Sequence, residues 1–263
     1  MNVSLLMLGT GTSQGVPAIG CDCETCRSTD PRDRRLRPSA LFTVGGRTLL
    51  VDTSSDFRWQ MLRHGIRRID AVLYTHHHFD HIGGFDDLRQ FNYLQSATMP
   101  LYGQSETLDE IRVTFRYAFG EARQEGGGIP SARMQTIVGG DPFDIGGATV
   151  MPVSVKHGIL PVLGYRIGDV AYITDTNFIP ETSFALLDGL DVLVLDALRH
   201  HAHPTHFSLE QSIETARRIG ARRTYFTHIA HNIRHERDGA LLPENMEFSY
   251  DGLLIKSQRE AYD

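Results

Sequence analysis

The feature that most constrains this chain is the pattern H-x-H-x-D-H, formed by His76, His78, Asp80 and His81. An apolar run over residues 69–74 precedes the pattern and predicts a buried strand that leads into it. Residues two apart in an extended backbone point to the same side, so His76 and His78 are expected to face together. Imidazole and carboxylate groups at this density indicate a metal site, and one short loop can serve two neighbouring ions.

Length and composition set broad limits on the class of protein. The chain has 263 residues, of which 41% are hydrophobic, and we expect residues 1–263 to form a single globular domain. The net charge of −6 does not favour broad electrostatic capture of nucleic acid. The sequence shows no charged-then-apolar leader and no apolar stretch near the roughly 20 residues that span a bilayer. We therefore expect a cytoplasmic protein with no membrane partner and no stable nucleic-acid partner.

The three cysteines, Cys21, Cys23 and Cys26, lie close together near the N-terminus. An odd number at this spacing argues against a disulfide framework and, in a reducing compartment, favours thiolate metal ligands over free cysteines. A closed tetrahedral zinc site needs a fourth ligand. His231, just beyond another candidate ligand at His228, is well placed by sequence to supply it. Such a structural zinc would join the N-terminal loop to the rim of the active site.

Hydrophobic periodicity and turn signals predict a strand-rich chain with interspersed helices. The expected strands cover residues 3–8, 40–44, 48–51, 70–75, 148–155, 162–168, 170–174, 191–195, 225–227 and 253–255, with a hairpin turn at Gly45-Gly46. The expected helices cover residues 56–64, 104–117, 181–187 and 208–219. Ser208 and Gln211 predict a capping box for the last helix, and Gly220 predicts its end. This pattern suggests two sheets packed face to face and covered by helices.

Three further candidate ligands each follow a predicted strand: His157, Asp175 and His228. A lone histidine or aspartate in such a position is more often a turn residue. Here, however, four separate strands each end in a ligand-type side chain. Active sites are commonly assembled from loops at strand ends, so the conjunction favours one shared site.

With these residues in this order, the chain resembles the metallo-β-lactamase superfamily. The resemblance implies an α/β (α+β) fold, the four-layer αβ/βα metallo-β-lactamase sandwich, with two divalent metal ions between the sheet edges. It assigns the ligands as follows: His76, His78 and His157 to one metal, Asp80, His81 and His228 to the other, and Asp175 to both. The ligand set suits zinc, manganese or iron and does not choose between them. Aspartate rather than cysteine at position 175 disfavours the antibiotic-hydrolysing branch.

His206 lies just before the predicted helix over residues 208–219. In the phosphodiesterase branch of the superfamily, a histidine at a helix start of this kind faces the substrate phosphate, and a helix N-terminus favours an anion. We therefore expect His206 to orient the scissile phosphate and to protonate the leaving alcohol. A purely local hydrogen-bonding role is the alternative, and His203 is the next candidate catalyst. Asp80 is the second candidate catalytic residue.

The opening loop Leu8–Pro17, the cysteine set and His206 together resemble the PhnP-type phosphodiesterases. Members of that family carry a structural zinc on three cysteines and a histidine beside a dinuclear site. They hydrolyse 5-phosphoribosyl 1,2-cyclic phosphate, generic phosphodiesters and 2′,3′-cyclic nucleotides. The resemblance implies a phosphoric diester hydrolase in which a metal-bound hydroxide attacks a small cyclic or diester phosphate. It also suggests a homodimer.

Other interpretations remain open. A tRNA 3′-processing endoribonuclease shares this site plan but predicts an RNA-gripping arm, and the flexible loop expected over residues 121–130 is short and weakly basic. An ester or thioester hydrolase is a second alternative, and a non-catalytic binding protein would be expected to have lost a ligand. The arginines at 32–37 could attract phosphate or form a solvated loop, and none is placed in the site. His77 is expected to face away from the metals.

Overall fold

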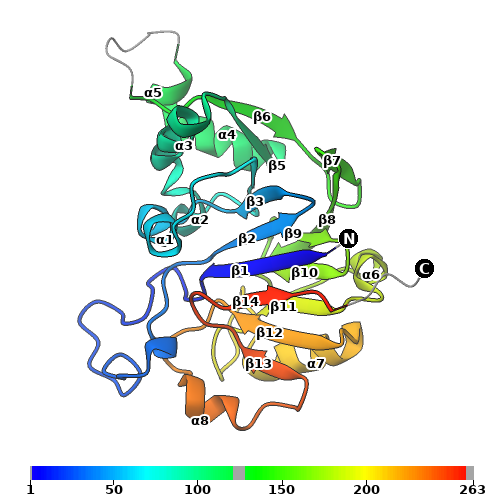
Figure 1. Ribbon diagram of the computed structural model, residues 1–263. Coiled ribbons are helices and arrows are strands. Elements are labelled where there is room, and N and C mark those ends of the chain that lie inside the picture. Colours follow the sequence, from blue (N-terminus) through cyan, green and yellow to red (C-terminus); the bar gives the residue numbers. More distant parts are fainter. Residues whose placement is uncertain (1, 121–127, 259–263) are drawn as a thin grey trace.

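The computed structural model describes residues 2–120 and 128–258 and contains two seven-stranded sheets packed face to face (Figure 1). In spatial order, the first sheet consists of β14 (Leu254–Lys256), β1 (Val3–Gly9), β2 (Ser39–Val44), β3 (Arg47–Val51), β4 (Ala71–Leu73), β5 (Met99–Gly103) and β6 (Ala132–Thr136). The second consists of β13 (Met246–Phe248), β12 (Arg223–Thr227), β11 (Val192–Asp196), β10 (Val170–Ile173), β9 (Leu160–Ile167), β8 (Ala148–His157) and β7 (Phe143–Ile145).

Helices cover the outer face of each sheet and complete four layers (Figure 1). They are α1 (Phe57–His64), α2 (Phe79–Ile82), α3 (Leu88–Gln95), α4 (Ser105–Thr114), α5 (Arg116–Phe119), α6 (Glu181–Phe184), α7 (Leu209–Ile219) and α8 (His235–Gly239), with 3-10 turns at Pro31–Asp33, Phe85–Asp87 and Ala185–Leu187. None of these described helices has the length and apolar character needed to cross a bilayer. The expected αβ/βα sandwich is confirmed.

Alternating burial in β1 illustrates how the layers form. Leu5 and Met7 join the core between the two sheets, where they share a cluster with Tyr165 of the second sheet. Leu6 and Leu8 point the other way and pack in the cluster under α1, α3 and α4. Because side chains alternate along a strand, one apolar strand can supply both cores.

Several predicted elements are found, with local differences. The β2–β3 hairpin turns through Gly45 and Gly46, whose φ angles of 54° and 75° suit a turn that glycine favours. Both bonds of the Ser208–Gln211 capping box are present at α7. The helix expected over 104–117 is instead interrupted at Phe115, which leaves helical geometry and packs its ring 4.8 Å from that of Phe85.

Other differences also have local causes. The strand expected over 70–75 ends at Leu73, because the backbone N–H of Thr75 bonds the carboxylate of Asp52 instead of a neighbouring strand. The helix α3 and the strands β5 and β6 were not predicted. The loop expected over 121–130 falls mainly on residues 121–127, which lie outside the described residues.

The strand directions bring the candidate site residues to one edge. β10, β11 and β12 run parallel to one another, and β8 has the same direction because β8 and β10 are both antiparallel to β9. In the first sheet, β3 and β4 are also parallel. Loops that leave the carboxyl ends of these strands therefore meet at neighbouring edges of the two sheets.

A buried ion pair joins the N-terminal segment to the chain just after β12. Arg35 and Asp33 are almost completely buried, with Nη2 of Arg35 lying 2.9 Å from Oδ1 of Asp33. The same guanidinium donates to the carbonyl oxygens of Ala230 (3.1 Å) and Ile233 (3.0 Å), and Asp33 accepts from the N–H of His235 (2.8 Å). Neither alternative considered for the arginine-rich stretch applies to Arg35, which is structural and shielded from solvent.

We predict that Arg35→Ala lowers the free energy of unfolding by about 3–5 kcal/mol, because it leaves Asp33 buried and unpaired. Urea unfolding followed by circular dichroism would measure the change. Arg34→Ala is the matched control, because Arg34 is exposed and its loss should cost under about 0.5 kcal/mol. Equal stabilities of the two variants would contradict the structural role of the ion pair.

Candidate metal centre

Three residues at the shared edge adopt left-handed backbone conformations. Asp52, Asp175 and His228 have φ angles of 60°, 50° and 58°. Asp52 and His228 directly follow β3 and β12, and Asp175 is the second residue after β10. Such conformations cost on the order of 1–3 kcal/mol outside glycine and persist where the surroundings hold them. The sharp turn at each strand end directs all three side chains to the same place.

The first group of candidate ligands combines the histidine pattern with the end of β8. His76, His78 and His157 place one nitrogen each within 4.8 Å of one another, and Nε2 of His76 lies 3.0 Å from Nδ1 of His78. His157 is the last residue of β8, and its Nδ1 donates to the carbonyl oxygen of Thr205 at 2.7 Å. That bond leaves Nε2 of His157 free to act as a ligand.

The second group contains Asp80, His81, Asp175 and His228, again with one atom of each within 4.8 Å of the others. Nε2 of His81 lies 3.3 Å from an oxygen of Asp80 and 3.3 Å from Oδ1 of Asp175. Nε2 of His228 lies 3.3 Å from the other oxygen, Oδ2, of Asp175. Oδ2 is also 3.9 Å from Nε2 of His76, so Asp175 faces both groups.

These separations fit metal coordination. A tetrahedral ion with bonds of about 2.1 Å keeps its ligand atoms about 3.4 Å apart, close to the spacing of both groups. Nε2 of His81 and both ring nitrogens of His228 are buried and make no hydrogen bond to any described residue. Buried polar atoms are normally satisfied, so orphaned nitrogens that converge on a carboxylate are what a cation would complete.

A chain of hydrogen bonds behind the ligands sets the orientation of two rings. Asp52 is fully buried, and its Oδ2 accepts from Nδ1 of His81 (2.7 Å) and from the hydroxyl of Thr75 (2.8 Å). The Thr75 oxygen in turn lies 3.0 Å from Nδ1 of His76 and can accept its proton. Nδ1 of His76 and Nδ1 of His81 are thus both engaged in hydrogen bonds. The Nε2 atom of each ring is therefore the one that faces the candidate metal centre.

The electrostatics of the site favour neutral imidazoles for most of the histidines and negative charge on the carboxylates between them. Burial lowers the pKa of His76 well below its usual range, and burial also lowers the pKa values of His157 and His228. Neutral imidazole is the form that binds a metal. For His81, burial opposes protonation, but Asp175 and the neighbouring carboxylates raise the pKa well above its usual range. The negative charge of the carboxylates around His81 would also stabilise a bound cation.

His206 lies against both groups. Its ring is 4.4 Å from that of His157 and stacks 4.6 Å from that of His228. Nδ1 of His206 donates to Oδ2 of Asp196 at 2.8 Å, and this carboxylate also accepts from the backbone N–H of Thr176. Nε2 is therefore the ring nitrogen left to face a ligand.

His203 and His77 lie outside these groups. Nδ1 of His203 lies 3.2 Å from the Thr205 hydroxyl, and its ring is 5.2 Å from that of His206. His77 belongs to none of the ligand groups among the described residues. Asp52 and Asp196 also contact the site, although the sequence did not predict them there. Asp52 directly follows β3, and Asp196 is the last residue of β11. A position at a strand end is the same signal that identifies His157, Asp175 and His228 as candidate ligands.

A separate group lies on the N-terminal loop. The sulfur atoms of Cys21, Cys23 and Cys26 are 3.2, 3.4 and 3.7 Å from Nδ1 of His231, distances suited to four ligands around one zinc ion. Burial raises the pKa of the Cys23 thiol, but hydrogen bonds from the Cys26 N–H and from His231 outweigh it and lower the pKa to about 6. A thiolate at Cys23 is the form that a metal requires.

The glycine loop closes one side of the site. A Cβ atom at Gly11 would lie 2.8 Å from the carbonyl oxygen of Arg35, so glycine is needed for this close approach. The carbonyl oxygen of Thr10 accepts from the N–H of Ile229, next to His228. These contacts hold the loop beside the strand end that supplies a candidate ligand.

A cavity of about 240 Å³ opens beside His206 and His228. Residues 12–15 of the glycine loop form one wall, and His203 and Asn232 contribute to the others. The cavity is therefore a space in which a small ligand would meet His206 and His228, a candidate ligand of the second group.

Comparisons with known proteins agree with this arrangement. A solved structure described as a new diphosphatase from the PhnP family is 44% identical, covers 97% of each chain and superimposes with a TM-score of 0.91. An octanoyltransferase of Porphyromonas gingivalis is 39% identical over 251 residues, which are 94% of this chain but 50% of that protein. The chain thus spans about half the length of that relative. A ribonuclease Z of Mycobacterium sp. (strain KMS) is 27% identical over 226 residues, 75% of this chain and 79% of that protein.

A match to a family model and the PhnP-family structure together show the family of this chain. The model of the beta-lactamase superfamily domain matches residues 47–229, which include the H-x-H-x-D-H pattern, His157, Asp175 and His228. The PhnP-family structure extends the match to 97% of the chain. The chain belongs to the metallo-β-lactamase superfamily and, within it, is a PhnP-type metal-dependent hydrolase.

Proposed function

We propose that this hydrolase cleaves small cyclic or diester phosphates at a dinuclear metal site. Two ligand sets would hold the metals: His76, His78 and His157 for one, Asp80, His81 and His228 for the other, with Asp175 between them. Two bound divalent ions would supply an activated water and neutralise charge on the phosphoryl group. Imidazole and carboxylate ligands suit zinc, manganese or iron and do not select one of them.

The contact of His206 with both ligand groups carries the choice of substrate class. Asp196 holds Nδ1 of His206 at 2.8 Å, so Nε2 is presented toward the cavity beside His157 and His228. A histidine so placed can bind a phosphoryl oxygen and pass a proton to the departing alcohol. Burial lowers the pKa of His206 and raises that of Asp196. An ionised Asp196 would stabilise the protonated ring that this step needs.

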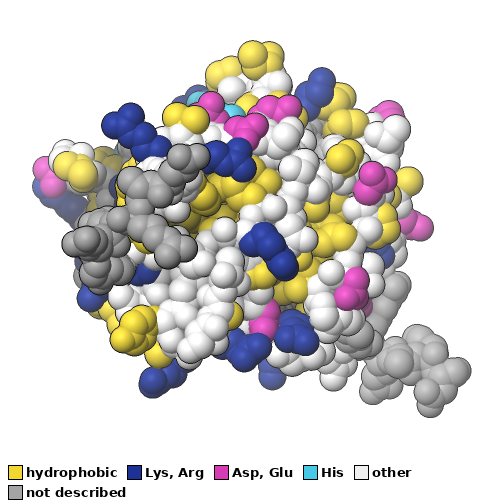
Figure 2. Space-filling view, turned by 90° about the horizontal axis from the view of Figure 1, so that it is seen from above, with side chains coloured by type: hydrophobic (Ala, Val, Ile, Leu, Met, Phe, Trp, Pro, Cys, Tyr) yellow, Lys and Arg dark blue, Asp and Glu magenta, His cyan; other side chains and the backbone are white. Residues whose placement is uncertain are grey.

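The cavity favours small substrates over long polymers. At about 240 Å³ it accommodates a sugar phosphate or a single nucleotide rather than an extended strand. Lys and Arg side chains are scattered among acidic and hydrophobic ones on the face seen in Figure 2 and form no continuous basic track there. An RNA backbone bound across this face would usually need such a track.

Hydrolysis of a diphosphate bond is the second candidate. The 44% identical structure is described as a diphosphatase, and a P–O–P linkage presents the same phosphoryl chemistry with a phosphate rather than an alcohol as leaving group. The ribonuclease Z and octanoyltransferase relatives support RNA cleavage and acyl transfer or thioester hydrolysis as further alternatives.

A substrate panel tests these candidates. We predict that protein loaded with zinc or manganese hydrolyses bis(p-nitrophenyl) phosphate and at least one cyclic ribose phosphate, with kcat/KM at least about tenfold above that for a dinucleoside diphosphate, precursor tRNA or an acyl thioester. Activity should disappear after chelation and return with metal. Preferred cleavage of the diphosphate would select the second candidate, and no metal-dependent turnover of any phosphodiester would overturn the proposal.

We predict that His206→Ala keeps both active-site metals but loses about 10²–10⁴-fold in kcat on a phosphodiester, because proton transfer is lost. Metal analysis and steady-state kinetics would measure the two effects separately. His203→Ala should keep most activity, and His201→Ala, at an exposed position, is the control. Loss of metal in His206→Ala would place His206 among the ligands, and a larger rate loss in His203→Ala would reverse the two roles.

We also propose that Cys21, Cys23, Cys26 and His231 hold one structural zinc ion. The four-ligand geometry and the lowered pKa of Cys23 support this proposal. The site would fix the loop that precedes Arg35 to the segment that follows His228, so metal binding there would contribute to folding.

We predict that Cys23→Ser removes one equivalent of zinc and clearly lowers the melting temperature. The kcat per folded molecule should change less, because the substitution acts on stability rather than on the chemical step. Mass spectrometry of the native protein and thermal unfolding would measure these changes. Asp22→Asn, at an exposed position in the same loop, should keep the full zinc content. The same zinc stoichiometry in Cys23→Ser and wild type would contradict a structural zinc at this site.

A further inference from the structure

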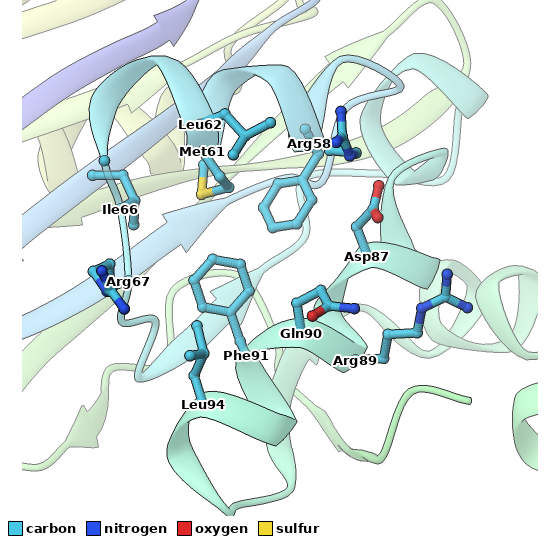
Figure 3. A pocket seen from close by; sticks show the side chains of 12 residues that line it. Arg58, Met61, Leu62, Ile66, Arg67, Asp87, Arg89, Gln90, Phe91 and Leu94 are labelled. Carbon is cyan, nitrogen blue, oxygen red and sulfur yellow. The ribbon is translucent and has the colours of Figure 1, made fainter. Parts of the chain in front are cut away.

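A groove between α1 and α3 lies on the helical layer that covers the first sheet, outside the candidate metal centre. Its volume is about 710 Å³, larger than that of the cavity beside His206. Figure 3 shows α1 on one side and α3 on the other, with their side chains directed toward the space between them. The groove contains none of the candidate metal ligands.

The floor of the groove is apolar. The rings of Phe57 and Phe91 are tilted by 52° with centroids 5.8 Å apart, and both belong to the lining. Met61 also lines the groove, opposite Phe91 in Figure 3. Leu62 and Leu94, one from each helix, line the groove but remain 57% and 56% exposed. Two large aliphatic side chains are thus left half in water beside a hydrophobic floor.

Arginine side chains surround this apolar floor. Arg58 and Arg67 line opposite ends of the groove in Figure 3, and neither forms an ion pair or hydrogen bond with any residue that the structure describes. Arg89 also lines it but is paired with Asp86 at 2.9 Å. Asp87 is the acidic residue of the lining. Arg58 interacts electrostatically with the carboxylate of Asp87. In a chain with a net charge of −6, exposed guanidinium groups beside an apolar floor are complementary to an anion.

The dimensions favour a small ligand. Both helices have eight residues, or about 12 Å of length, which matches an extended chain of roughly ten carbon atoms. The volume falls within the range of about 300–1,000 Å³ that is common for small-molecule pockets. A stable protein partner usually needs about 800 Å² of contact surface on each side, more than two short helices provide.

We propose that the α1–α3 groove binds an amphipathic anion, a small molecule with an unbranched apolar chain and an anionic head group. The chain lies over Phe57 and Phe91 between Leu62 and Leu94. The head group pairs with Arg58 or Arg67 at an end of the groove. This site is independent of the proposed phosphoesterase activity, because it shares no residue with the metal centre.

Titration of the metal-loaded protein with decanoate and with decyl sulfate, below their micelle concentrations, tests the proposal. Trp59 on α1 is the single tryptophan of the chain and is 58% exposed, so its fluorescence reports on this helix, while calorimetry gives the stoichiometry. We expect saturable binding of one molecule per chain. Uncharged decyl maltoside should bind at least about tenfold more weakly, and decyltrimethylammonium should not bind.

Variants at the groove separate its two contributions. Leu62→Glu should weaken binding of decanoate at least about tenfold, whereas Leu241→Glu, at an 80% exposed position after α8, should leave it unchanged. The double variant Arg58→Gln, Arg67→Gln should weaken decanoate and decyl sulfate but not decyl maltoside. Circular dichroism would verify that each variant is folded.

Three results would overturn the proposal. One is the absence of saturable binding, and another is equal affinity for the anionic and cationic probes. The third is a dimer in sedimentation that Leu62→Glu dissociates, because the groove would then be occupied by a second copy of the chain. Loss of phosphodiesterase activity alone would not bear on the groove.

Discussion

The buried carboxylate of Asp175 is the constraint on which the rest of the site depends. Its side chain is 2% exposed, and a charge so far from water is tolerated only with compensating partners. Burial raises its pKa, but His228 and His81 outweigh that effect and hold it well below its usual range. The two sheets must therefore bring the imidazole of His228, just after β12, and that of His81, in α2, to the same point. This convergence of imidazoles on a carboxylate is also the arrangement of a metal site.

Two further buried carboxylates hold the histidines in place. Asp52 orients His81 and, through Thr75, His76, while Asp196 orients His206. The left-handed backbone at Asp52 shows that this orientation has an energetic cost, which the surrounding packing offsets. The reacting side chains are therefore preorganised by residues that do not themselves face the cavity.

The N-terminal segment is as much a part of the site as the strand ends. Arg35 ties this segment to Ala230 and Ile233, and the cysteine group reaches His231 between them. Both links converge on the chain just beyond His228, so they fix the wall of the cavity that the glycine loop forms. A disturbance of either link should alter the shape of the cavity without touching a candidate ligand of the dinuclear centre.

Elements with a local signal could be predicted from the amino-acid sequence. The histidine pattern, the glycine hairpin turn and the capping box of Ser208 depend on neighbouring residues, and strand periodicity was enough to suggest two sheets covered by helices. Features that depend on distant partners became visible only in the folded chain: the break at Phe115, which packs on Phe85, the early end of β4, and the roles of Asp52, Asp196 and Arg35. Each of these is fixed by burial and by contacts between segments far apart in the chain. Local periodicity predicts neither of them.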